Sequence, residues 1–204
     1  MSCTEIYSFD NNGNAHLYGS VANAWRGAMA VWTEMESRYL PLFIPEYVKA
    51  CNWYEDGMGY EDIVPILGYT PSRLSPVFHG KSHEDEIWKL ADDPNVPYHD
   101  RIVLASTFDN ILVKKEDLPK LIEFFKGFGG ETSLPEQAEI LQKAYDDPDV
   151  IAVGFNQTSV NADTWTNAGG RDPETDEWLP YNCLTMDKHT WLFDEEGVNN
   201  EQGQ

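Results

Sequence analysis

Residues 101–155 carry the most regular pattern of apolar and polar positions in the chain, and this pattern predicts strands around a pair of helices. The short apolar runs 102–105 and 111–113 each follow polar residues and contain β-branched side chains, as strands commonly do. Apolar residues then recur at helical spacing in 118–125 and again in 134–145. Each of these two segments is therefore predicted to form a helix with one buried face.

The run 150–155 is apolar without alternation, which predicts a central strand covered on both faces. Two polar residues mark where the helices before it begin. Asp117 is a candidate N-cap, because its carboxylate can accept from free backbone N–H groups of a first helical turn. Ser133 and Glu136 have the spacing of a capping box. Residues 101–155 thus predict a strand–helix–helix–strand unit.

The N-terminal segment predicts a hairpin followed by a long helix. In residues 4–18, two apolar stretches flank the pair Asn12–Gly13, whose residue types suit a type I′ turn. Ser20 is placed to cap a helix that continues to residue 39. Trp25 and Trp32 lie on one apolar stripe of that helix, which predicts a core face or a partner face.

The middle of the chain predicts short helices, including one over 45–53. Residues 60–78 resemble a helix-turn-helix, with Gly68 at the turn. The resemblance implies DNA reading by the second helix, where Arg73 is the sole basic residue. Because DNA contact normally requires several phosphate-neutralising side chains, a plain helical corner is the favoured interpretation.

These elements together predict an α+β fold with a mixed sheet and amphipathic helices. We expect a hairpin and helical region over 1–98, an α+β region over 99–193, and a flexible acidic tail over 194–204, with one continuous domain as the alternative. The Trp-rich C-terminal part predicts a hairpin loop around 169–175 and a last strand at 191–193.

Charge is the most unusual feature of the composition. The chain of 204 residues has 35 acidic and 14 basic residues, a formal net charge of −21. Such a charge repels nucleic acid and anionic membrane surfaces and favours basic partners, although it also serves solubility alone. The three cysteines share no metal-binding spacing, and no apolar run reaches membrane length. These observations predict a cytoplasmic protein without membrane association.

Metal-binding patterns are incomplete. His79 and His83 are four residues apart, but a helix over 83–90 would leave His79 outside it. Acidic residues alternate from 172 as in a calcium loop, yet Glu177 and Cys183 occupy the positions that need glycine and glutamate. No nucleophile elbow or glycine-rich phosphate loop is present in the sequence. We therefore expect neither a metal nor a cofactor, and we do not favour an enzyme.

The leading hypothesis is a non-enzymatic acidic binding protein with a basic protein as partner, because spaced carboxylates can imitate the phosphates of a duplex. In size and charge the chain is similar to small acidic inhibitors of host defence carried by phage and mobile elements. Direct nucleic-acid binding is not expected, and the oligomeric state is left open. The alternatives are a helix-turn-helix regulator, a structural or assembly accessory protein, and an enzyme. The candidate binding residues are acids in three groups: Glu84, Asp85, Asp92 and Asp93; Asp146, Asp147 and Asp149; and Asp172, Glu174, Asp176 and Glu177.

Overall fold

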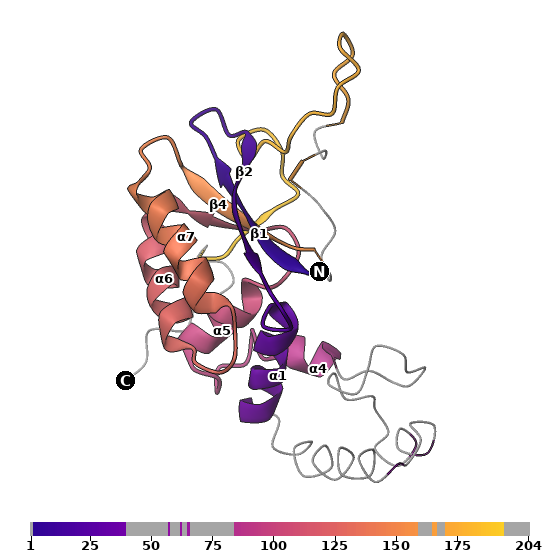
Figure 1. Cartoon of the computed structure of the whole chain (residues 1–204), viewed down its shortest axis with the longest axis vertical. Helices are drawn as coiled ribbons and strands as arrows, with labels where there is room; N and C mark the ends of the chain where they lie inside the picture. The colour runs from indigo at the N-terminus through magenta and orange to yellow at the C-terminus, as the bar shows by residue number, and fades with distance from the viewer. Residues whose placement is uncertain are drawn as a thin grey trace.

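A mixed five-stranded sheet forms the centre of the molecule (Figure 1). The computed structural model describes residues 2–39, 84–158 and 170–193, together with positions 57, 62, 65, 165 and 166. The strands are β1 Cys3–Phe9, β2 Ala15–Ala22, β3 Ile111–Lys114, β4 Ala152–Gln157 and β5 Thr190–Trp191. Their order is β2-β1-β4-β3-β5, and only the β3–β5 pair is parallel. The predicted α+β class and mixed sheet are confirmed.

Five described helices surround this sheet, most of them on one side (Figure 1). They are α1 Ala28–Tyr39, α4 Glu84–Lys89, α5 Tyr98–Ala105, α6 Leu118–Gly127 and α7 Leu134–Asp146. A 3-10 turn over Lys115–Asp117 leads from β3 into α6. The positions of β3, α6, α7 and β4 agree with the sequence predictions.

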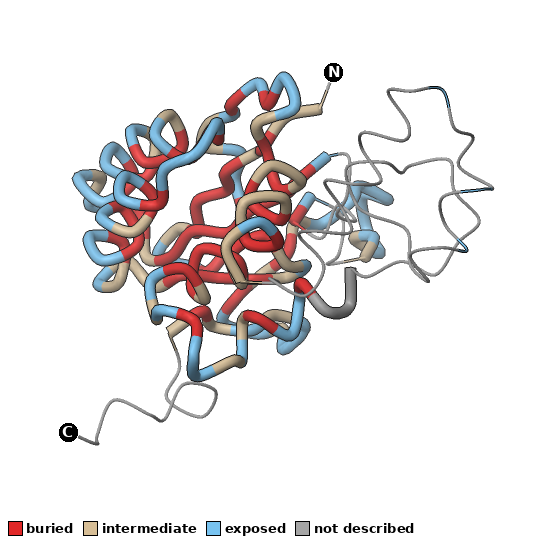
Figure 2. Tube along the Cα trace, turned by 90° about the horizontal axis from the view of Figure 1, so that it is seen from below, coloured by how far each residue is buried: buried red, intermediate tan, exposed pale blue. Residues whose placement is uncertain are grey.

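The sheet separates two apolar cores. Alternate residues of β1 point to opposite faces, so that Ile6 packs with the helices and Phe9 packs with the C-terminal segment. Trp165 and Tyr181 form the centre of the second core, with ring centroids 5.2 Å apart. Figure 2 shows the buried positions concentrated along the strands and on the inner sides of the helices.

The predicted strand at 102–105 is wrong, because these residues form the end of α5. Ile102, Val103 and Leu104 are all buried, because α5 packs against α1 and α6 and these three residues belong to the core between the helices and the sheet. A short helix buried on several sides shows no apolar–polar alternation. Its apolar run therefore looks like a buried strand in the sequence, and tertiary packing overrides β propensity.

The N-terminal hairpin is confirmed, but its turn is not type I′. Gly13 has a φ of 83°, whereas Asn12 is absent from the residues with positive φ that a type I′ turn requires. The Gly13 N–H donates to the Asp10 carbonyl over 2.8 Å. The Asp10 carboxylate accepts from the backbone N–H groups of Asn12 and Asn14 over 2.8 and 3.0 Å. The hydrogen-bonded turn therefore has Asn11 and Asn12 at its centre, neither with a positive φ, and the Asp10 carboxylate stabilises it.

The predicted helix start at Ser20 is also wrong. β2 continues to Ala22 because it pairs with β1 along its whole length, and α1 begins only at Ala28. Trp25 lies in the connecting turn with a φ of 73° and is 94% exposed. Trp32 is buried in α1, so the two tryptophans do not share a helical face.

Neither predicted helix cap forms a side-chain capping bond. Asp117 and Ser133 occupy the N-cap positions of α6 and α7, but neither side chain bonds to the free N–H groups of its helix. Glu136 pairs instead with Arg26, with 2.7 Å between Oε1 and Nη1. The predicted capping box is therefore wrong.

The Ser133 side chain belongs to a buried cluster of hydrogen-bonded polar side chains. Ser133 Oγ donates to Asn23 Oδ1 over 3.1 Å and accepts from Gln137 Nε2 over 3.0 Å. Thr4 Oγ1 donates to Gln157 Oε1 over 2.6 Å. All five residues are at least nine-tenths buried, so the cluster joins β1, β4, α7 and the turn before α1 through satisfied polar groups.

Some predictions fall outside the described residues. These are the helix over 45–53, the helix-turn-helix resemblance with Arg73, the histidine at 79, and the tail over 194–204. The helix predicted over 83–90 agrees with α4. The division of the chain between residues 98 and 99 stays a prediction.

Candidate functional site

A projecting hairpin carries the third group of predicted acidic residues. Residues 170–179, called the acidic hairpin below, extend away from the sheet and helices (Figure 1). Arg171 and Trp178 form an antiparallel bridge, and the Leu179 N–H donates to the Gly170 carbonyl over 2.8 Å. The hairpin predicted for this part of the chain is thus confirmed, and four carboxylates and one guanidinium lie along it.

Asp172 organises the tip of the acidic hairpin. Its Oδ1 accepts from the backbone N–H groups of Glu174 and Thr175 over 2.7 and 3.0 Å. The bond from Thr175 contributes most, and together with the bond from Glu174 it holds the pKa of the Asp172 carboxyl below its usual value. The sequence indicates this role, because Asp before a turn commonly bonds to the backbone two residues later.

Arg171 and Asp176 join the two sides of the acidic hairpin. Their side chains form an ion pair with 2.6 Å between Nη1 and Oδ2. The Arg171 guanidinium also lies 4.9 Å from the centroid of the Trp178 ring. Asp176 has a φ of 56°, a conformation that Asp tolerates better than most residues. The arrangement gives a small hairpin a defined shape.

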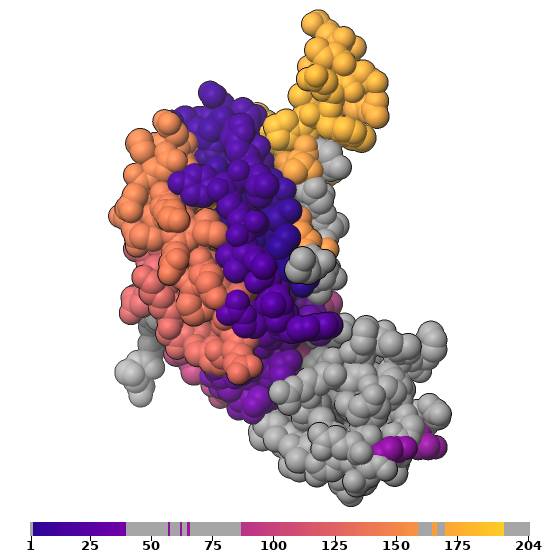
Figure 3. All heavy atoms as spheres, viewed as in Figure 1, coloured from indigo at the N-terminus to yellow at the C-terminus, as the bar shows by residue number. Residues whose placement is uncertain are grey.

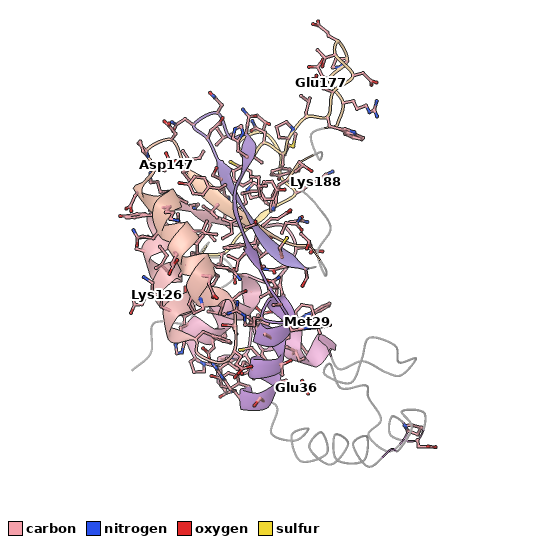
Figure 4. All side chains as sticks on the ribbon, viewed as in Figure 1. Met29, Glu36, Lys126, Asp147, Glu177 and Lys188 are labelled. Carbon is pink, nitrogen blue, oxygen red and sulfur yellow. The ribbon has the colours of Figure 1, made fainter. Side chains whose placement is uncertain are left out.

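Glu174 and Glu177 are the carboxylates of the acidic hairpin that face solvent. Both are exposed, and within the described residues neither side chain has a hydrogen bond or ion pair. Figure 4 shows Glu177 on the projecting hairpin, far from the body of the molecule. Trp178 and Leu179, which are 56% and 38% exposed, follow directly. The hairpin therefore offers negative charge beside an apolar surface.

The base of the acidic hairpin is anchored to the sheet. The Tyr181 N–H donates to the Trp165 carbonyl over 2.9 Å, and the Tyr181 carbonyl accepts from Ala15 over 3.0 Å. The Tyr181 hydroxyl accepts from the Lys188 N–H over 2.9 Å and lies 2.8 Å from His189 Nδ1. These contacts position the hairpin on the second face of the sheet.

The second group of acids lies at the C-terminal end of α7. Asp147 is used within the fold: its Oδ2 accepts from the Tyr18 hydroxyl over 3.3 Å, and its carbonyl accepts from Lys115 Nζ. Burial, followed by the Asp147 charge, raises the pKa of Tyr18. Asp146 accepts from Gln142 over 3.2 Å, whereas Asp149 is exposed.

The first group of acids lies near α4. Asp92 and Asp93 follow this helix, and Asp93 Oδ1 accepts from the Asn95 backbone N–H over 2.8 Å. Glu84 and Asp85 belong to α4, but their side chains are outside the described residues. In Figure 1, α4 lies near the opposite end of the molecule from the acidic hairpin. The fold therefore does not bring the three predicted groups together.

A cluster of charged side chains around the buried Asp100, between α1 and α5, was not predicted. Asp100 Oδ2 accepts from the Tyr39 hydroxyl and lies 3.4 Å from Arg38 Nη1, and Asp100 Oδ1 lies 3.2 Å from His99 Nε2. Burial, and then the bond to Asp100, raise the pKa of Tyr39 to about 12. The sequence pattern predicts a strand at 102–105, and with that prediction Asp100 is not placed in the first turn of a helix. The position of Asp100 beside α1 therefore could not be anticipated.

Other chemical sites are not evident in the described part of the chain. No group of three or more His, Cys, Asp and Glu side chains there could hold a metal ion. Cys183 is buried, and burial raises the pKa of its thiol, which disfavours the nucleophilic thiolate. No helix in the described ranges is long and apolar enough to cross a bilayer.

Comparisons with protein-family models, with curated proteins and with solved structures find no match to this chain.

Proposed function

We propose that the protein is a non-enzymatic acidic binding protein whose acidic hairpin enters a basic groove of a nucleic-acid-binding protein and blocks it. The observation that carries this proposal is the projection of the hairpin from the sheet with Glu174 and Glu177 turned to solvent. A projecting element can enter a concave surface that the body of the molecule cannot reach.

The charge of the whole chain supports this proposal. A net charge of −21 attracts a basic partner over a distance set by the salt concentration and raises the rate of encounter. Carboxylates in a nucleic-acid groove release the same bound anions and meet the same Lys and Arg side chains as phosphates do. The proposed inhibition follows from occupation of this groove.

The residues beside the carboxylates support a specific contact. Trp178 is large, partly exposed and held in place by Arg171, and aromatic residues of this kind frequently dominate binding energy. The hydrogen bonds of Asp172 preform the turn, which reduces the entropy lost on binding. The acidic hairpin thus combines charge for attraction with an apolar anchor.

The proposal is tested by capture of partners from a lysate of the cells in which the protein acts, at ~0.1 M and ~0.5 M salt, where screening lengths differ about twofold. The tagged wild type is compared with the double variant Glu174→Gln/Glu177→Gln. A matched control, Glu123→Gln/Glu139→Gln, removes the same charge from exposed positions on α6 and α7.

We expect the wild type and the control to recover a nucleic-acid-binding protein at ~0.1 M salt only. The Glu174→Gln/Glu177→Gln variant should recover much less of this partner at the same salt concentration. Equal recovery by both double variants would show that the acidic hairpin is not the contact. Recovery that is unchanged at ~0.5 M salt would show that charge does not carry the binding.

A further inference from the structure

Within the described residues, the outer edge of β2 has no backbone partner over most of its length. β2 is the first strand of the sheet order, so only its inner edge pairs with β1. At its start the outer edge is covered, because Asn14 bridges to Asn182 and the Ala15 N–H donates to Tyr181. From residue 16 to residue 22, no other described backbone bonds to this edge. Figure 3 shows the N-terminal atoms as a continuous indigo band along the molecular surface.

β2 carries one bulge, at Tyr18, but this edge lacks the charged side chains and prolines that usually prevent strand pairing. Residues 11–25 contain no Asp, Glu, Lys or Arg, the longest such stretch in a chain with 49 charged residues. β2 also lacks proline. Free edges without charged side chains or proline are templates for pairing with another strand. Leu17 on β2 is 58% exposed, so the strand also presents apolar surface.

We propose that the outer edge of β2 pairs antiparallel with β2 of a second copy of this chain, which joins the two sheets. Two molecules with a net charge of −21 repel each other across most of their surfaces. β2 itself contributes no carboxylate to this edge, and two carboxylates beside it, Asp10 and Asp147, are bonded to His16 and Tyr18. A second copy that approaches along the strand therefore meets an edge whose own side chains carry no acid. An antiparallel pair of identical strands is self-complementary, as a twofold dimer requires.

The backbone pattern of the hairpin defines the register of this pair. The Asn23 N–H donates toward β1, to the Ser2 carbonyl, whereas the Ala15 N–H donates away from β1, to the Tyr181 carbonyl. Because backbone groups alternate between the two edges of a strand, these two bonds identify the residues of β2 whose N–H and C=O groups point outward. Leu17 and Ser20 are outward positions on the two sides of the bulge at Tyr18. When Leu17 of one copy lies opposite Ser20 of the other, outward groups meet at both positions. The twofold axis then passes between residues 18 and 19.

The dimer and the acidic hairpin respond to salt in opposite ways. Salt screens the repulsion between two acidic copies, so the dimer should tighten as salt rises. Binding of a basic partner should weaken over the same range. The two proposals also use different residues, and each can fail without the other.

The test is sedimentation equilibrium of the full chain at ~0.1 M and ~0.5 M salt, up to roughly 0.3 mM protein, a range that covers micromolar dissociation constants. We expect a monomer–dimer equilibrium whose dissociation constant falls several-fold at the higher salt. Ser20→Asp places two carboxylates beside the axis and should raise the constant by roughly tenfold or more. Ser37→Asp adds the same charge at an exposed position of α1 and should change the constant less than twofold.

A second variant keeps the test valid if Ser20→Asp fails to fold, as judged by circular dichroism. Leu17→Lys alters a side chain that is already exposed and should weaken the dimer in the same direction. A chain that stays monomeric at both salts overturns the proposal, and so does a dimer that both edge variants leave unchanged.

Discussion

Arg171 and Asp176 hold the two sides of the acidic hairpin together through an ion pair of 2.6 Å, and the Arg171 guanidinium covers the Trp178 ring. The single basic residue of the hairpin therefore makes contacts within the hairpin that stabilise its conformation. The pair leaves Glu174 and Glu177 as the outward charges.

Replacement of Arg171 separates the effect of shape from that of charge. Arg171→Ala makes the hairpin more acidic, but it also removes the contacts that position Trp178. We expect weaker binding of the captured partner, by roughly threefold to tenfold, because an unordered hairpin loses more entropy when it binds. Titration calorimetry measures this change. Lys188→Ala, which removes a positive charge from an exposed side chain of the C-terminal segment (Figure 4), should not weaken binding.

The turn of the acidic hairpin should open in acid. Bonds from the backbone N–H groups of Thr175 and Glu174 lower the pKa of Asp172, so the ionised form stabilises the turn. A lowered pKa means that the turn is fully formed above the ordinary value of about 3.9 and is lost as pH falls through the lower folded value. Amide NMR signals of Glu174 and Thr175 should report this transition. In Asp172→Asn it should vanish, and a midpoint at the ordinary value would contradict the assignment.

The Tyr39 hydroxyl should stabilise the junction between α1 and α5. Asp100 is 2% exposed and accepts from this hydroxyl, so Tyr39→Phe removes a donor to a buried carboxylate. We expect a loss of about 1–3 kcal/mol in the free energy of unfolding, measured by denaturant titration. Tyr145→Phe, at an exposed position of α7, is the control and should change it by less than about 0.5 kcal/mol. An equal effect of both substitutions would argue against the buried pair.

Ser133 and Glu136 should contribute unequally to stability, contrary to a capping box. Ser133→Ala removes a fully buried hydroxyl from a polar cluster and should cost about 1–3 kcal/mol. Glu136→Gln breaks an ion pair whose side chains are 42% and 40% exposed, and should cost less than about 1 kcal/mol. Thermal or denaturant unfolding of both variants measures the difference. Similar losses for the two would favour the capping box.

Much of the fold is predictable where local pattern and tertiary environment agree. The helices α6 and α7 each bury one face, so their apolar residues recur at helical spacing, and β4 is covered on both faces, so its run is continuously apolar. The prediction of 102–105 failed because α5 is a short helix surrounded by the core, which leaves no periodic signal. The boundary between β2 and α1 depends on pairing with β1, and this pairing is not encoded locally.

The candidate site was predictable only in its composition. The acidic residues over 172–177 and their hairpin follow from residue types, because Asp and Gly favour such turns. The projection of this hairpin, and its separation from Asp147 and from α4, depend on long-range contacts such as that between Tyr181 and Ala15. The sequence likewise does not distinguish Asp147, which bonds to Tyr18, from the exposed Glu177.

The most direct test of the proposed function is competition between duplex DNA and this protein for the captured partner. In a binding assay at ~0.1 M salt, labelled protein is held on the partner while duplex DNA is added. If the acidic hairpin occupies a nucleic-acid groove, DNA displaces the protein completely, and Glu174→Gln/Glu177→Gln is displaced at lower DNA concentration than Glu123→Gln/Glu139→Gln. A complex that holds DNA and this protein together would contradict the account.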